Sequence, residues 1–158
     1  MASVYVAVVG PGDPSPAAEA DAEAVGRLLA DRGAVVVCGG LGGVMAAACR
    51  GAKAGGGTTV GILPGVDRAE ANAWVDVAVT TGMGEARNAL VVRSVDAVVA
   101  VAGGYGTLSE IALALRLDRP VVGLASWDIE GVRSARDPAD AVAEALQAVA
   151  GAPLRRRP

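Results

Sequence analysis

Short apolar runs alternate with segments of helical spacing along the chain, and this alternation limits the folds open to it. The runs are rich in β-branched residues and most end in glycine; they cover residues 4–10, 34–39, 58–63, 75–80, 95–103 and 120–124. Runs without a polar face are typical of strands buried on both sides of a parallel sheet. Helical spacing fills the gaps, at about 16–31, 43–54, 84–93, 107–118 and 138–150. The pattern predicts an α/β fold, a doubly wound parallel sheet with helices on both faces and right-handed crossovers.

The length of 158 residues suits one domain, and the chain has no internal repeat and no low-complexity linker. We therefore expect a single domain over residues 1–158. Two polar connections, 64–74 and 125–136, are predicted to be loops, and the first is long enough to border a site. A short flexible tail is expected at about 152–158, where Arg155, Arg156 and Arg157 form a solvated chain end.

Charge and residue types exclude several classes of function. The net charge is −3 and the other basic residues are scattered, so neither a nucleic-acid groove nor a membrane partner is expected. Cys38 and Cys49 are the only cysteines and histidine is absent, which excludes structural zinc and leaves no metal site. The chain shows neither a signal peptide nor an apolar run of about 18 residues, which predicts a cytoplasmic protein. Without histidine, any catalysis must use carboxylates, arginine or main-chain groups.

Glycines gather directly after the predicted strands. In a parallel sheet these turns share one edge, where ligands of open α/β sheets bind, and the following helix presents free N–H groups to an anion. The pattern therefore predicts a site for a phosphate-bearing small molecule. Its candidate residues are Gly10, Gly12, Gly40, Gly42, Gly43, Gly103, Gly104, Tyr105, Gly106 and Thr107. The alternative is that glycine is abundant, at 22 residues, and that tight turns need it regardless.

Two nucleotide-binding motifs are absent from these loops. Neither glycine-rich loop contains the GK[ST] of a P-loop, and the first turn, VGPGDPS, lacks G-x-G-x-x-G. A dinucleotide-dependent reductase is therefore disfavoured.

Thr107 and Glu110 have two interpretations. Their spacing is that of a capping box, in which the threonine accepts a hydrogen bond from the third helical N–H and the glutamate reaches back to the cap. The alternative is that both face a ligand at the start of the helix. Glu110 cannot serve both roles in one rotamer, so the sequence leaves both interpretations open.

Arg87 falls on an apolar helical face with Met83, Leu90 and Val91, close to the predicted sheet edge. A guanidinium that starts from such a face needs an anionic partner. That partner is Glu110, a ligand phosphate or a carboxylate in the core, and the sequence does not choose among them. The alternative is an arginine that extends to solvent.

Three motifs occur in order: GGLGGVMAAACRGAKAGGGTTVGILP, GMGEARN and GGYGTLSEI. Together they resemble the Lonely Guy family and its relatives, often labelled "possible lysine decarboxylase", over about residues 3–124. The resemblance implies a dimeric, Rossmann-like phosphoribohydrolase. Such an enzyme cleaves the N-glycosidic bond of a nucleoside 5′-monophosphate such as AMP, releases the base and ribose 5-phosphate, and needs no cofactor.

The resemblance also implies roles for single residues. Gly103, Gly104, Gly106 and Thr107 would hold the 5′-phosphate, with Tyr105 in the same loop and Met83 in the GMGEARN motif beside them. Arg87 and Glu110 would be the catalytic pair. The carboxylate of Glu110 would stabilise an oxocarbenium-like transition state, as in glycoside hydrolases, and the arginine would position it.

The sequence departs from the enzyme pattern at three places. Ala102 stands where the motif has proline, Asn88 where lysine follows the arginine, and VVGPGD replaces a CGS-type first turn. In these respects the chain resembles a shorter sister branch that includes molybdenum-cofactor carrier proteins. The alternative to a hydrolase is thus a non-catalytic carrier of the molybdenum cofactor or another phosphorylated ligand, and a third is a sensing or structural dimer. The site chemistry favours the hydrolase.

The segment 107–118 is apolar almost all the way round, with leucine, isoleucine or alanine at most positions. A helix of this kind is covered on both sides, by the sheet and by a partner. We therefore expect a homodimer. The alternative is a helix covered entirely within its own domain.

Overall fold

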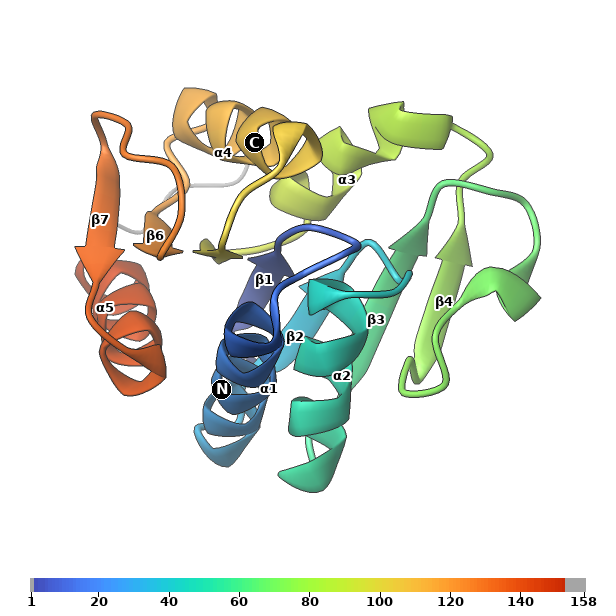
Figure 1. Ribbon diagram of the computed structural model, residues 1–158, viewed down its shortest axis with the longest axis horizontal. Coiled ribbons are helices and arrows are strands. Elements are labelled where there is room, and N and C mark those ends of the chain that lie inside the picture. The colour runs from blue at the N-terminus through green and yellow to red at the C-terminus, as the bar shows by residue number, and fades with distance from the viewer. Residues whose placement is uncertain (1, 153–158) are drawn as a thin grey trace.

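A seven-stranded parallel sheet forms the centre of the protein, shown in the computed structural model of Figure 1. Residues 2–152 are described, and the expected arginine tail at 155–157 lies outside them. The strand order is β4-β3-β2-β1-β5-β6-β7, and each neighbouring pair is parallel. The strands are β1 (Tyr5–Val9), β2 (Val35–Cys38), β3 (Thr59–Leu63), β4 (Val77–Thr80), β5 (Ala97–Val101), β6 (Val121–Leu124) and β7 (Val132–Ala135).

Six strands occupy the six predicted apolar runs, but β7 lies in a segment expected to be a loop. β7 pairs with β6 at the edge of the sheet and has only four residues, VRSA. Its arginine and serine are exposed and only its alanine is buried. An edge strand of this kind lacks the apolar run that marks a buried parallel strand, so the sequence pattern missed it.

Helices follow the strands as the spacing predicted. They are α1 (Pro16–Asp31), α2 (Val44–Ala54), α3 (Asn88–Arg93), α4 (Tyr105–Arg116) and α5 (Pro138–Gly151), with short 3-10 helices η1 (Arg68–Glu70) and η2 (Gly84–Arg87). The side chain of Ser15 accepts a hydrogen bond from the N–H of Ala18 and so caps α1, as expected for Ser followed by Pro.

The helices form a layer on each face of the sheet. In β1, Val6 and Val8 face a core shared with α1, α2 and α5. Ala7 and Val9 alternate with them and face the core shared with α3 and α4. These two layers make the protein a single-domain Rossmann-like α/β fold with helices on both faces, which confirms the predicted fold class (Figure 1).

The strand order reverses between β1 and β5. From β1 the chain builds outward to β2, β3 and β4, and then returns to place β5 on the other side of β1. The loops that leave β1 and β5 therefore diverge and open a crevice at the carboxyl edge, the usual ligand position in sheets of this kind.

Candidate functional site

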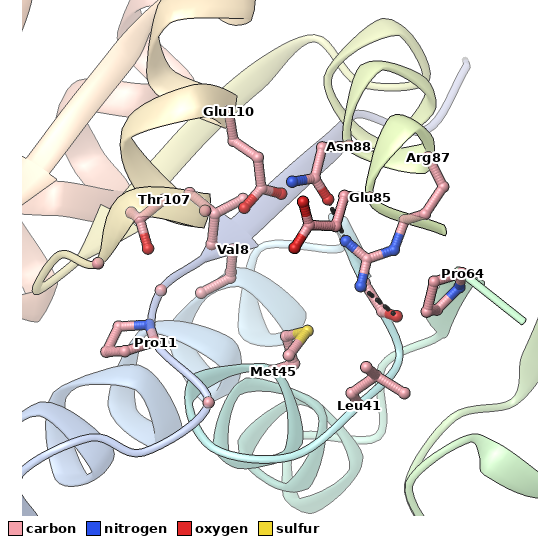
Figure 2. Close-up of a pocket in the computed structure, with 16 residues that line it drawn as sticks. Val8, Pro11, Leu41, Met45, Pro64, Glu85, Arg87, Asn88, Thr107 and Glu110 are labelled. Atoms are coloured by element: carbon pink, nitrogen blue, oxygen red, sulfur yellow. Dashed lines mark hydrogen bonds between the residues drawn. The ribbon is translucent and has the colours of Figure 1, made fainter. Parts of the chain in front are cut away.

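A pocket of about 400 Å³ opens at this reversal point (Figure 2). Its walls come from β1 and the turn after it, the loops after β2 and β3, the start of α2, the η2–α3 segment, and the first two turns of α4. The lining residues are Val8, Val9, Gly10, Pro11, Gly12, Gly39, Leu41, Met45, Pro64, Glu85, Arg87, Asn88, Gly104, Gly106, Thr107 and Glu110.

The structure brings together only part of the set of residues proposed from sequence. The lining includes Arg87, Glu110, Gly10, Gly12, Gly104, Gly106 and Thr107. The remaining candidates, Gly40, Gly42, Gly43, Gly103, Tyr105 and Met83, are not among the lining residues. Tyr105 is 86% exposed at the start of α4 and Met83 is 48% exposed before η2. Arg87 and the glycine turn before α4 share one pocket, the juxtaposition on which the sequence hypothesis depends.

Close packing accounts for some of these glycines. A Cβ on Gly10 would lie 2.5 Å from the carbonyl oxygen of Val101, and one on Gly103 would lie 2.6 Å from the indole nitrogen of Trp127. Gly43 has a φ of +66°, and its Cβ would lie 2.5 Å from the Gly12 carbonyl oxygen. A Cβ on Gly106 would meet no atom within 4 Å. Packing therefore explains Gly10, Gly43 and Gly103, whereas Gly106 lines the pocket with no packing constraint.

The start of α4 faces the pocket without a side-chain cap. The helix begins at Tyr105, two residues earlier than predicted, with Gly104 at the N-cap position. Thr107 therefore lies inside the first turn, and the capping-box interpretation of Thr107 and Glu110 is wrong. The Thr107 hydroxyl is buried and has no hydrogen-bond partner within residues 2–152. The first N–H groups of the helix also lack intrahelical partners, so this end offers several donors at one place.

Arg87 is buried at the end of η2 and does not extend to solvent. Its Nη1 donates a hydrogen bond to Oδ1 of Asn88, and its Nη2 donates to the carbonyl oxygen of Gly39 at 3.3 Å. Its Nε has no partner in the described part of the chain. The guanidinium is thus held by neutral acceptors and keeps an unused donor.

Glu110 is 7% exposed and lines the same pocket from the second turn of α4. Burial raises the pKa of its carboxyl to about 7, and the charge of Arg87 only partly opposes this effect. No hydrogen bond to this carboxyl forms within the described residues. Arg87 and Glu110 therefore share a pocket, while the hydrogen bonds of the arginine go elsewhere.

Several lining residues escaped the sequence analysis. Leu41, Met45 and Pro64 form an apolar side of the pocket, opposite Glu110 in the view of Figure 2. Asn88 was noted only as a departure from the enzyme motif, although its place beside Arg87 was a signal for contact. The sequence analysis also gave no role to Trp127, which lies outside the lining. Its Nε1 donates a hydrogen bond to the carbonyl oxygen of Gly104 at 3.3 Å and so supports the turn before α4. A tryptophan in a polar loop after a strand was the only signal for it.

The two cysteines lie beside the pocket and not in it. Their Sγ atoms are 3.5 Å apart between the end of β2 and α2, and both thiols are free and buried. The hydrogen bond with Cys49, together with burial, raises the pKa of Cys38.

Residues 2–152 contain no group of three or more side chains suited to a metal ion. None of the helices described is long and apolar enough to cross a membrane.

Comparison with known proteins identifies the family. The model of the SLOG cluster4 family matches residues 3–150. The chain belongs to this family. An uncharacterized protein from Archaeoglobus fulgidus is 43% identical over 143 residues, which cover 90% of this chain and 94% of that protein. The sequence resemblance to a sister branch of the Lonely Guy superfamily is thus confirmed.

Solved structures of two relatives share the whole fold of this SLOG cluster4 protein. The molybdenum cofactor binding protein from Rippkaea orientalis is 36% identical, with a TM-score of 0.89 over 95% of this chain and 99% of that one. The Moco carrier protein from Chlamydomonas reinhardtii is also 36% identical, with a TM-score of 0.88 over 96% of this chain and 100% of that one.

Proposed function

We propose that this SLOG cluster4 protein binds a phosphate-bearing small molecule at the start of α4 and carries it uncleaved, with the molybdenum cofactor as the first candidate. One observation carries the proposal: within residues 2–152 the buried Thr107 hydroxyl and the buried Arg87 Nε have no hydrogen-bond partner, and the two residues line one pocket. Buried polar groups are nearly always hydrogen-bonded, so we expect acceptor atoms of a ligand at each of these two donors.

The phosphate would accept hydrogen bonds from the first N–H groups of α4 and from Thr107. Gly104 and Gly106 line the pocket, and their lack of side chains lets an anion approach the main chain there. Arg87 would supply the compensating charge from the opposite wall. We propose that Gly10 and Gly12 likewise bound the ligand from the turn after β1, whereas Gly40, Gly42, Gly43, Gly103, Tyr105 and Met83 support the site from outside its lining.

The remainder of the ligand would lie against the apolar side formed by Leu41, Met45 and Pro64. A volume of about 400 Å³ falls in the range of small-molecule sites and suits a fused heterocycle with a phosphate arm. A pterin and a purine both meet this description. The names of the two relatives, one a molybdenum cofactor binding protein and the other a Moco carrier protein, favour the pterin.

A second candidate function is the phosphoribohydrolase implied by the motifs. Its supporting observation is Glu110, an ionisable carboxyl in the pocket with a pKa near 7, beside Arg87. The ionised form would stabilise an oxocarbenium-like state and orient water, with no cofactor required. Against it, Arg87 donates to Asn88 and Gly39 and so does not hold Glu110 in its ionised form. We therefore favour binding over cleavage.

Fluorescence can test the binding site directly. Trp74 and Trp127 are the only tryptophans, so the Trp74→Phe variant leaves Trp127, which contacts the turn before α4, as the sole reporter. We expect its emission to change in a saturable way with isolated molybdenum cofactor, and more weakly with AMP. The matched Trp127→Phe variant should show no such change. Absence of a saturable change with either compound would rule out the proposed site.

Chromatography separates the two candidate functions. The carrier proposal expects intact AMP after prolonged incubation with the wild-type protein. Release of free base that is lost in Glu110→Gln would instead establish the hydrolase.

We also propose that the protein forms a homodimer. Beside α3 the sheet carries an apolar hollow of about 250 Å³, lined by Tyr5, Val37, Val60, Ile62, Val79, Leu90 and Ser94. The helix over 107–118 was expected to meet a partner with one face, and its Leu113, Leu115 and Leu117 are partly buried against the core on that side of the sheet. The hollow is therefore the surface we assign to the partner.

A cytoplasmic location and the absence of nucleic-acid and membrane partners stay predictions.

A further inference from the structure

A path of side-chain hydrogen bonds connects Arg87 to the first turn of α4. Asn88 accepts a hydrogen bond from Arg87 at Oδ1, and its Nδ2 donates to Oγ of Ser109 at 3.3 Å. The Ser109 hydroxyl in turn donates to the carbonyl oxygen of Gly106 at 2.7 Å. The path thus runs from one wall of the pocket to the other through two side chains to which the sequence assigned no role.

The path has a single direction. A guanidinium has only donors, so the side-chain oxygen of Asn88 must face Arg87 and its NH₂ group must face Ser109. The Ser109 oxygen then accepts from Asn88 and its proton is free for the Gly106 carbonyl. A reversed Asn88 amide would place its NH₂ group against the guanidinium, where no acceptor exists. Only the observed orientation of the amide satisfies both hydrogen bonds.

Arg87 donates its hydrogen bonds to neutral acceptors although a stronger acceptor, the Glu110 carboxyl, lines the same pocket. A buried guanidinium and a buried carboxylate attract each other strongly, and a bidentate pair would be the ordinary outcome. Here Asn88 and Gly39 take the two terminal nitrogens instead. In the view of Figure 2, the amide of Asn88 and the carboxyl of Glu85 both lie between the Glu110 carboxyl and the Arg87 guanidinium, and only the Asn88 amide is hydrogen-bonded to the guanidinium.

We propose that Asn88 and Ser109 are positioning residues that keep Arg87 from pairing with Glu110, so that both groups stay available to a ligand. Asn88 holds the guanidinium towards the end of β2. Ser109 fixes the amide of Asn88 and ties it to the turn of α4 that carries Thr107 and Gly106. The reason for holding the arginine rests on the proposed function, because an arginine already paired with Glu110 would have little charge left for a phosphate.

The test measures the free protein and needs no ligand. Carboxyl ¹³C NMR follows the titration of Glu110, and Arg87 and Glu85 are the other charged side chains that line the pocket. In Asn88→Ala, Arg87 is released and we expect the pKa of Glu110 to fall from about 7 to below about 6, as for a carboxyl beside a cation. Ser109→Ala should lower it by a smaller amount, and Ser109→Thr, which keeps the hydroxyl, should leave it unchanged.

The serine variants keep the test decisive. Asn88 is buried, so Asn88→Ala removes packing as well as hydrogen bonds, whereas Ser109 is exposed and its substitution should disturb the fold less. The proposal would be overturned if the pKa of Glu110 were the same in the wild type, Ser109→Ala and Ser109→Thr. It would also be overturned if a folded Asn88→Ala kept the wild-type pKa of Glu110. Binding of AMP or the cofactor is measured separately. If those ligands fail to bind, the proposed function is refuted. The NMR titration still decides whether Asn88 and Ser109 position Arg87.

Discussion

The Glu110 carboxyl and the Arg87 guanidinium line one pocket, and burial of the carboxyl outweighs the charge of the arginine. The result is a glutamate whose pKa lies near 7 rather than at its ordinary 4.5. This relationship predicts how Glu110 contributes to stability as the pH changes.

Stability should fall as pH rises through this interval. Between about pH 4.5 and 7 the native state keeps a proton on Glu110 that the unfolded state releases, so the stabilisation is complete below the unfolded pKa and lost above the folded one. The total is about 3 kcal/mol. Urea unfolding at pH 5 and pH 8 measures most of this difference. Glu110→Gln should unfold with less dependence on pH and be the more stable protein at pH 8; equal slopes in both proteins would contradict this.

Arg87→Ala should weaken binding of AMP or inorganic phosphate at least tenfold, because a charge-assisted hydrogen bond and the compensating charge are lost. Arg87→Lys keeps the charge but not the planar fork, and we expect an intermediate affinity. Calorimetry at two salt concentrations measures both. Binding by Arg87→Ala with wild-type affinity would place the anion elsewhere.

Gly106→Ala should leave stability nearly unchanged and weaken ligand binding, since the added Cβ meets no protein atom and lies in the pocket wall. Gly43→Ala is the matched contrast. Its φ of +66° and the 2.5 Å approach to the Gly12 carbonyl oxygen should cost about 2 kcal/mol or more of folding free energy. Thermal unfolding and ligand titration of both variants check the pair. Normal ligand binding by Gly106→Ala would remove that turn from the site.

Ala102 has a φ of +55°, in the left-handed region that disfavours residues with a Cβ. Ala102→Gly should therefore stabilise the protein by about 1 kcal/mol. Ala102→Pro, which would restore the enzyme motif, should destabilise it because proline cannot reach a positive φ. The Ala102 N–H also donates to the Leu124 carbonyl, a bond that proline removes. Denaturant midpoints of the two variants should move in opposite directions from the wild type.

Val79→Lys should convert the proposed dimer to a monomer without loss of fold, because Val79 borders the apolar hollow and is already 44% exposed. Val66→Lys is the control, since Val66 is 82% exposed and is not among the residues of the hollow. Sedimentation velocity gives the mass of each. A monomeric wild type, or a Val79→Lys dimer, would refute the assignment of this surface.

The sequence predicted the sheet well because its buried strands are almost wholly apolar, and it missed β7 because an edge strand with exposed Arg133 and Ser134 carries no such signal. It located the pocket through the turns that end the strands. It could not decide between a cap and a ligand contact for Thr107, since that depends on a helix start two residues upstream. The sequence could not predict the hydrogen-bond partners of Arg87 either, because only the folded sheet brings Gly39 close to it.

The reversal of strand order between β1 and β5 has a consequence for assembly of the site. Gly39 and Pro64 belong to the half of the sheet built outward from β1, whereas Glu110 belongs to the half that begins with β5. The pocket is therefore complete only when the crossover from β4 to β5 has brought the two halves together. A ligand bound there would contact both halves and stabilise their association, so binding should slow unfolding of the sheet as a whole.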